Sequence, residues 1–211
     1  MYGVRSLSLY EDDPANLSGL KENLSELTRS NEVHFIKTHE LPDDGNPAVL
    51  LVRDGRDAMV SFAHFIEDYG VVRRSRIGEF VAQLDAYRQH MLWGRPRFDQ
   101  LLRRVITGKY FDWSSHFLAW QAKPGRCALV NFESLTTRPA ETVQRSLAAL
   151  GIALQPRSNE AIPDFRQLHA TDPKFFRAGT TGQWRTEMNT ELEDLFWREH
   201  GKAMMEAGYA R

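Results

Sequence analysis

The stretch VHFIKTHELPDDGNPAVLLVRDGRDAMVSFAHFIEDY, residues 33–69, decides the fold of this chain. It contains two short apolar runs, residues 33–36 and 48–52, and polar residues follow each of them. Short apolar runs that are bounded by turn residues are typical of buried strands. Binding sites of open α/β sheets lie at such strand ends, so we expect a site where these two runs stop.

A helix is expected directly after the second run, with Asp54 or Asp57 as its N-cap. A strand-to-helix turn presents free backbone N–H groups, and Arg53 adds a planar set of donors that suits a phosphate. We therefore expect an anion site that includes Arg53 and Ser61. The alternative is that Arg53 and Arg56 only pair with Asp54 and Asp57 on a solvated turn. The apolar face of the helix is predicted to consist of Ala58, Phe62, Phe65, Ile66 and Tyr69.

The composition is that of a globular protein with one domain. Of the 211 residues 42% are hydrophobic and 26% charged, and the net charge of −1 argues against a dedicated nucleic-acid-binding protein. Cys127 is the single cysteine, so an internal disulfide and a thiolate metal cluster are excluded. The sequence has no signal-peptide core and no apolar run of the roughly 18 residues that a membrane span needs. We expect a cytoplasmic protein without a membrane span.

The rest of the chain continues the alternation of strands and helices. We predict a third strand over residues 127–132, and helices over residues 110–121, capped near Asp112, and over residues 142–150, stopped at Gly151. A last helix begins at Asn189 or Thr190. This alternation predicts an α/β domain with a parallel sheet, although the short link of residues 38–47 also permits an antiparallel hairpin. Residues 155–176, with three prolines, are expected to form a long ordered loop.

Two further features have alternative interpretations. Residues 71–109 contain nine basic and three acidic residues, which suits either the steering of an anionic ligand or ordinary solvated helix faces. His116 lies among aromatic residues of its predicted helix, where it is either a packed core residue or a catalytic group.

Three blocks, in this order, resemble the sulfotransferases that use 3′-phosphoadenosine-5′-phosphosulfate (PAPS). The segment FIKTHELP at residues 35–42 is similar to the K-T-H-L-P segment of that family. The segment VLLVRDGRDAMVSFAHF at residues 49–65 resembles the strand and helix that hold the 3′-phosphate of the cofactor. The segment FFRAGTTGQW at residues 175–184 resembles the C-terminal R-K-G-x-x-G-D-W segment, although Ala178 replaces its lysine.

The resemblance implies an α/β fold with a P-loop-NTPase-like parallel sheet flanked by helices. It also implies transfer of a sulfuryl group from PAPS to a hydroxyl or amine, without a metal. By the match of the first block, His39 is the catalytic base and Lys37 is its cationic neighbour. The residues that the resemblance assigns to cofactor binding are Arg53, Ser61, Phe165, Arg177 and Gly179.

The family's 5′-phosphosulfate loop, a P-K-S-G-T-T-W-like segment, has no counterpart in residues 1–36. We therefore expect one sulfotransferase-like domain over residues 1–211 that is incomplete at the N-terminus, without the first strand, the phosphate loop and the first helix. The alternative is a truncated or degenerate fold that acts as a nucleotide-binding or interaction module without catalysis. A kinase is less favoured, since it also needs a glycine-rich loop. We expect a small-molecule or carbohydrate acceptor, and a homodimer stays open because residues 185–194 partly resemble a dimerisation motif.

Overall fold

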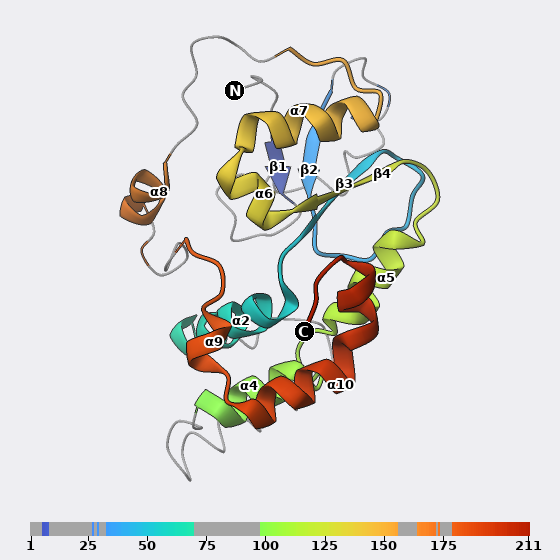
Figure 1. Ribbon diagram of the computed structural model, residues 1–211. Coiled ribbons are helices and arrows are strands. Elements are labelled where there is room, and N and C mark those ends of the chain that lie inside the picture. Colours follow the sequence, from blue (N-terminus) through green and yellow to red (C-terminus); the bar gives the residue numbers. More distant parts are fainter. Residues whose placement is uncertain are drawn as a thin grey trace.

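The structure is a computed structural model that describes residues 6–8, 27, 29, 33–69, 98–155, 164–171, 173 and 179–211. Figure 1 labels its elements along the chain. The described strands are β1 (Ser6–Ser8), β2 (Phe35–Lys37), β3 (Ala48–Val52) and β4 (Cys127–Asn131). The described helices are α2 (Gly55–Tyr69), α4 (Phe98–Ile106), α5 (Trp113–Gln121), α6 (Phe132–Thr137), α7 (Pro139–Ala149), α8 (Phe165–Thr171), α9 (Trp184–Glu187) and α10 (Thr190–Glu206).

All described strand pairs are parallel, which confirms the prediction of an α/β fold. β1 pairs with β2, with Ser6 opposite Phe35, and β3 pairs with β4, with Ala48 opposite Cys127. Among the residues described, the strands form two sheets of two strands each rather than one continuous sheet. β2 and β3 are not paired with each other there, so the antiparallel hairpin that the link of residues 38–47 permitted is not formed.

The pleat of β3 and β4 buries one face and leaves the other exposed. Leu50 and Val52 on β3 are buried, as are their neighbours Ala128 and Val130 on β4. Side chains alternate between the two faces of a strand, so the residues between them point the other way. The exposed face carries Val49, Leu51 and Leu129.

Two predicted helix caps are confirmed. The Asp112 side chain accepts from the backbone N–H of Ser115 at 3.0 Å, and α5 begins at the next residue. Asn189 caps α10 in the same way, through the backbone N–H of Leu192. The helix predicted over residues 142–150 begins earlier, since Pro139 suits a first helical turn, and α6 precedes it.

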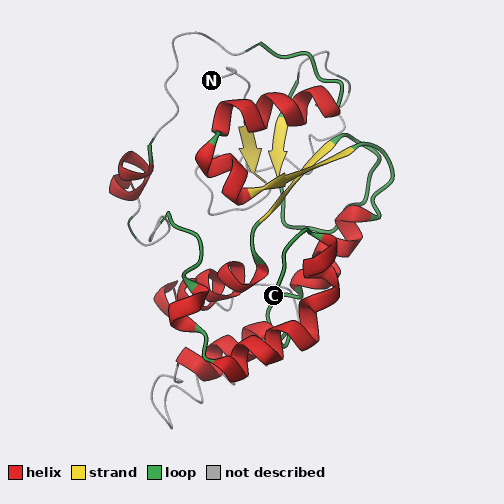
Figure 2. Ribbon diagram, in the orientation of Figure 1, coloured by secondary structure: helices red, strands yellow, loops and turns green. Residues whose placement is uncertain are grey.

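Apart from α8 and α9, the described helices form two groups (Figure 2). α6 and α7 pack beside β4, whereas α2, α4, α5 and α10 lie at the other end of the molecule and contact one another. α2 buries a wider face than predicted, because α4 and α10 both pack against it. Its most buried apolar residues are Met59, Val60 and Ala63, while the predicted Ala58, Phe62 and Ile66 are only partly buried.

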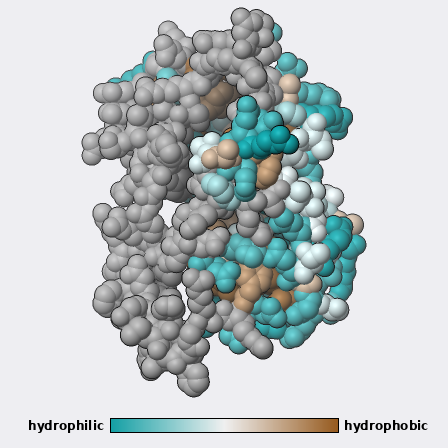
Figure 3. All heavy atoms as spheres, turned by 90° about the vertical axis from the view of Figure 1, so that its left-hand side faces the viewer, coloured by the Kyte–Doolittle hydropathy of each residue, from teal (hydrophilic) through white to brown (hydrophobic). Residues whose placement is uncertain are grey.

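The predicted loop of residues 155–176 is described in part, and it contains the short helix α8. Of the basic segment 71–109, residues 98–109 are described and include α4, and the remainder of that prediction lies outside the described residues. In the view of Figure 3 the coloured surface is mostly polar, with small apolar areas between the polar ones. Within the described ranges, no helix combines the length and the apolar character that a membrane crossing requires.

Candidate functional site

The turn between β3 and α2 is built around an ion pair between Asp54 and Arg56. Oδ1 of Asp54 accepts from the backbone N–H of Arg56 at 2.9 Å and from its Nε at 3.0 Å, and Oδ2 accepts from Nη2 at 2.8 Å. Asp54 thus bonds the first turn of α2, as the predicted N-cap should. Arg56 is only 4% exposed. The predicted pairing is therefore present, but the solvated turn of the alternative interpretation is wrong.

Arg56 also joins this turn to the C-terminal part of the chain. Its guanidinium lies 3.8 Å from the ring centroid of Trp184 and 5.3 Å from that of Trp197. Nη2 donates a hydrogen bond to the Ala210 carbonyl at 3.2 Å. A planar guanidinium that stacks on aromatic rings gains a cation–π attraction while its N–H groups remain bonded in the plane. Arg56 therefore connects the turn to the C-terminal part of the chain and is not a ligand-binding cation.

Asp57 accepts hydrogen bonds from a second segment, residues 179–184. Its Oδ2 accepts from the backbone N–H of Gly182 at 2.6 Å, and its Oδ1 accepts from that of Trp184 at 3.1 Å. The residue is 1% exposed. Sequence reasoning missed this contact and offered Asp57 only as an N-cap or a partner of Arg53. The R-D-x-R-D run marks the turn, but no local pattern reveals a partner 125 residues away.

Arg53 faces the same segment. Its Nη2 donates to the Thr180 carbonyl at 3.1 Å and lies 3.9 Å from Oδ2 of Asp57. The guanidinium lies 5.0 Å from the centroid of the Phe132 ring. Nε is buried and has no hydrogen-bond partner among the residues described. The side chain as a whole is 22% exposed, so an anion can reach part of it, although not the buried Nε.

Two of the other predicted cofactor residues lie in contact. Gly179 has a positive φ of 59°, and a Cβ added there would lie 2.2 Å from the Phe165 ring, so both the backbone and the neighbour require glycine. Phe165 is 40% exposed at the start of α8. Since Gly179 precedes Thr180, the structure places Arg53, Gly179 and Phe165 around one segment. Ser61 is exposed further along α2, and Arg177 lies outside the described residues.

The end of β2 carries the predicted catalytic pair, and α5 is its neighbour. Nε1 of Trp120 on α5 donates to the Glu40 carbonyl at 3.1 Å. His39 keeps an exposed surface. The protein atoms around it nevertheless displace enough water to lower its pKa below the ordinary 6.5, and Lys37 and then His116 lower that pKa further. A histidine of this kind is neutral at neutral pH and can accept a proton.

His116 packs next to this strand end. Its ring centroid lies 5.1 Å from that of Phe111 and 6.3 Å from that of Trp120. Burial lowers the pKa of His116, and a hydrogen bond with the His39 backbone partly opposes that change. Its Nε2 is buried without a hydrogen-bond partner in the described part of the chain. The packing agrees with a core residue, and the contact with His39 places it beside the proposed chemistry.

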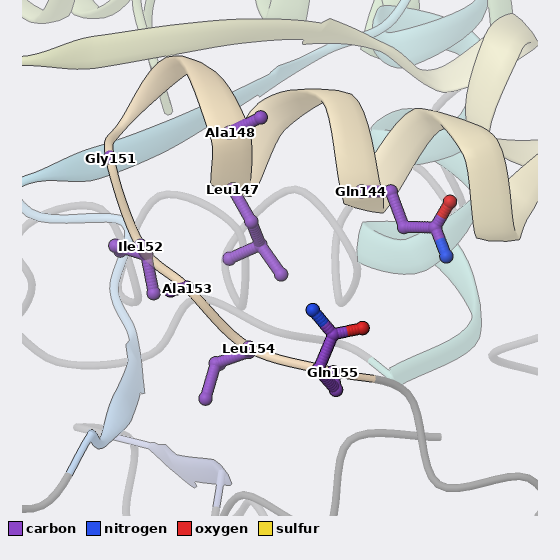
Figure 4. Close-up of a pocket in the computed structure, with 8 residues that line it drawn as sticks. All are labelled: Gln144, Leu147, Ala148, Gly151, Ile152, Ala153, Leu154 and Gln155. Atoms are coloured by element: carbon purple, nitrogen blue, oxygen red, sulfur yellow. The ribbon is translucent and has the colours of Figure 1, made fainter.

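An open pocket of about 580 Å³ lies elsewhere, between α7 and the segment that follows it. In Figure 4, Leu147 on α7 points toward Leu154 and Gln155 on that segment. None of the predicted site residues lines this pocket, and none of its lining residues is charged. It therefore has no part in the candidate site.

Comparisons with known proteins bear on the family and the fold of the chain. The family model described as "Sulfotransferase domain" matches residues 6–207. Among solved structures, the crystal structure of mouse sulfotransferase SULT7A1 complexed with PAP aligns with a TM-score of 0.61 and 17% sequence identity. The alignment covers 97% of this chain and 76% of that chain. Identity this low shows the fold alone, and the fold class predicted from the sequence is confirmed. No curated protein sequence matches the chain significantly.

Proposed function

Since this chain belongs to the sulfotransferase domain family, we propose that it transfers a sulfuryl group from PAPS to a hydroxyl or amine of an acceptor. The observation that carries the proposal is the position of Arg53. Its guanidinium lies against the segment of residues 179–184 at Thr180, and its side chain is 22% exposed. A charged donor that is partly exposed suits a phosphate.

The proposed cofactor site lies between α2 and the segment that leads to α9. Arg53 and Ser61 bind the 3′-phosphate from the side of α2, and Gly179 binds it from the other side. Arg177, which lies outside the described residues, is proposed as a further phosphate ligand from the sequence resemblance alone. The exposed ring of Phe165, which contacts Gly179, packs against the adenine. Each phosphate contact is a charge-assisted or backbone hydrogen bond, so the site needs no metal.

The proposed chemistry takes place at the end of β2. His39 removes the proton from the acceptor, the acceptor oxygen or nitrogen forms a bond to sulfur, and the bond from sulfur to the 5′-phosphate oxygen breaks. Lys37 stabilises the negative charge on the oxygens of the group in transfer. The lowered pKa of His39 supports this role, because the neutral ring is the form that accepts a proton.

The remaining expectations stay predictions. They concern the small-molecule or carbohydrate acceptor, the homodimer and the cytoplasmic location. The second candidate function is a nucleotide-binding module without catalysis, which uses the same phosphate contacts but not His39.

Calorimetry with 3′,5′-ADP tests the cofactor site. We expect Arg53→Ala to weaken binding by about 1.5–3 kcal/mol, the range for hydrogen bonds to charged groups. Arg145→Ala is the matched control, because Arg145 is an exposed arginine that pairs with Glu141 on α7. Equal affinities of both variants and the original chain would place the phosphate elsewhere.

Transfer from labelled PAPS, measured over a panel of phenols, alcohols, amines and saccharides, separates the two candidate functions. Turnover supports the transferase. Binding of 3′,5′-ADP without turnover on any acceptor supports the nucleotide-binding module.

A further inference from the structure

We propose that Asp57 is a positioning residue of the cofactor site, whose carboxylate holds residues 179–184 in the place that recognition of the 3′-phosphate requires. The inference rests on the proposed function, since it concerns the same nucleotide. By this inference, the buried side chain of Asp57 on α2 keeps residues 179–184 in a fixed position relative to Arg53.

The hydrogen bonds of Asp57 fix two separate peptide groups. Oδ2 accepts from Gly182 at 2.6 Å and Oδ1 accepts from Trp184 at 3.1 Å, so both carboxylate oxygens are used. Bonds to an ionised acceptor are about twice as strong as bonds between neutral groups. Arg53 binds the same segment with the opposite polarity, because its Nη2 donates to the Thr180 carbonyl. The strand-to-helix turn and the start of α2 thus hold the segment through a donor and an acceptor.

The surroundings of Asp57 supply partners for both of its carboxylate oxygens. It is 1% exposed, and a buried carboxylate is retained only where its charge is compensated. The two N–H groups and Nη2 of Arg53, which lies 3.9 Å from Oδ2, supply that compensation. Asp57 also lies in the first turn of α2, where the helix dipole favours a negative charge.

The far end of the segment is fixed a second time at Trp184. Its ring stacks against the guanidinium of Arg56 at 3.8 Å. Gly182 has a positive φ of 81°, so the chain turns between the two bonded peptide groups in a conformation that favours glycine. The segment is therefore ordered before a nucleotide arrives, and binding does not have to supply the cost of ordering it.

Asp57→Asn tests the proposal, because asparagine has the same shape but only one acceptor oxygen. We expect the Kd of 3′,5′-ADP to rise about tenfold, the equivalent of a weakened charged hydrogen bond. The Kd of 5′-AMP, which lacks the 3′-phosphate, should stay unchanged, so the preference for the 3′-phosphate should fall about tenfold. A general loss of stability would weaken both nucleotides alike.

Asp112→Asn is the matched control. Asp112 also accepts from a backbone N–H, that of Ser115 at 3.0 Å, but it caps α5 and has no described bond to residues 179–184. We expect little change in Tm, because asparagine caps helices about as well as aspartate, and unchanged Kd values for both nucleotides. Gly182→Ala is a second variant for the case in which Asp57→Asn does not fold, since it strains the turn without touching the buried carboxylate, and it should also reduce the preference for the 3′-phosphate.

The outcomes are distinct. The inference is wrong, and the proposed function stands, if three results are found together. The original chain binds 3′,5′-ADP, Arg53→Ala weakens that binding, and Asp57→Asn or Gly182→Ala keeps the full preference for the 3′-phosphate. Equal weakening of both nucleotides by Asp57→Asn also overturns the inference, because it indicates a purely structural role. If the original chain does not bind 3′,5′-ADP, the proposed function fails and the inference fails with it.

Discussion

The strand ends of β2 and β3 carry the two halves of the proposed site, and they differ most in burial. After β3, the residues Asp54, Arg56 and Asp57 are buried and bonded to one another or to the C-terminal part of the chain. At the end of β2, Lys37 and His39 are exposed. The difference suits the two tasks, because a phosphate site gains from fixed donors, whereas a catalytic base must reach a second substrate.

The largest expected effect concerns the exposed half. His39→Ala should lower the rate of sulfuryl transfer by about 10²–10⁴-fold, the usual contribution of a general base, while the affinity for 3′,5′-ADP stays nearly constant. Initial rates with labelled PAPS and calorimetry measure the two quantities. Asp43→Ala is the control, since Asp43 is an exposed acidic residue of the link after β2. Undiminished turnover in the His39 variant would remove the proposed base.

The next effect concerns the buried half. Arg56→Ala leaves the Asp54 carboxylate without the partner that bonds both of its oxygens, and breaking such a buried pair costs about 3–5 kcal/mol. Urea unfolding followed by circular dichroism measures this loss. Arg198→Ala is a suitable control, because Arg198 is exposed and pairs only with its neighbour Glu199 in the described contacts. A fall of less than about 1 kcal/mol in the free energy of unfolding is typical of an exposed ion pair, and it would contradict the stabilising role of the buried pair between Asp54 and Arg56.

A smaller effect is expected where the C-terminal residues meet the end of β3. The Tyr209 hydroxyl donates to Glu133 at 2.8 Å, and the other carboxylate oxygen of Glu133 accepts from the backbone N–H of Asp54 at 3.2 Å. Tyr209→Phe removes one hydrogen bond to a charged group, which should lower the free energy of unfolding by about 1.5–3 kcal/mol. Tyr110→Phe serves as the control for loss of a tyrosine hydroxyl. Equal stability of the two variants would contradict the prediction.

The smallest expected effect is a shift in the pH dependence of the transfer rate, which concerns the exposed half of the site. The pKa of His39 lies below 6.5, so the midpoint of the fall in rate on acidification, at which His39 is half protonated, should lie below that pH. The positive charge of Lys37 contributes to this lowering, and Lys37→Gln should therefore move the acid limb of the kcat/KM profile to higher pH. Each kcat/KM profile is divided by its own maximum before the acid limbs are compared, because the Lys37 variant is also expected to be slower. A shift to lower pH would show that Lys37 does not act on His39 in this way.

Features that depend on local sequence were predicted well. The apolar runs gave the strands around residues 35–37 and 48–52, and side-chain acceptors gave the starts of α5 and α10. These signals are local because a strand period or an N-cap involves residues only a few positions apart. The motif resemblance also named Gly179 and Phe165, which the structure brings into contact.

Long-range contacts were not predicted. The burial of Arg56 depends on Trp184 and Ala210, and the bonds of Asp57 depend on Gly182, which is 125 residues away. A single sequence contains no pattern that links such distant positions. The buried face of α2 was underestimated for the same reason, because α4 and α10 pack on it from later in the chain.

The separation of these partners has a consequence for the order in which the protein forms during synthesis. The turn with Arg56 and Asp57 is translated early, but the Ala210 carbonyl that Arg56 binds follows 154 residues later. At about 5–20 residues per second, the ribosome needs roughly 8–30 s to supply it. Thr180 and Gly182, which bond Arg53 and Asp57, are also translated at least 125 residues after these partners, so the two halves of the proposed cofactor site can meet only late in synthesis.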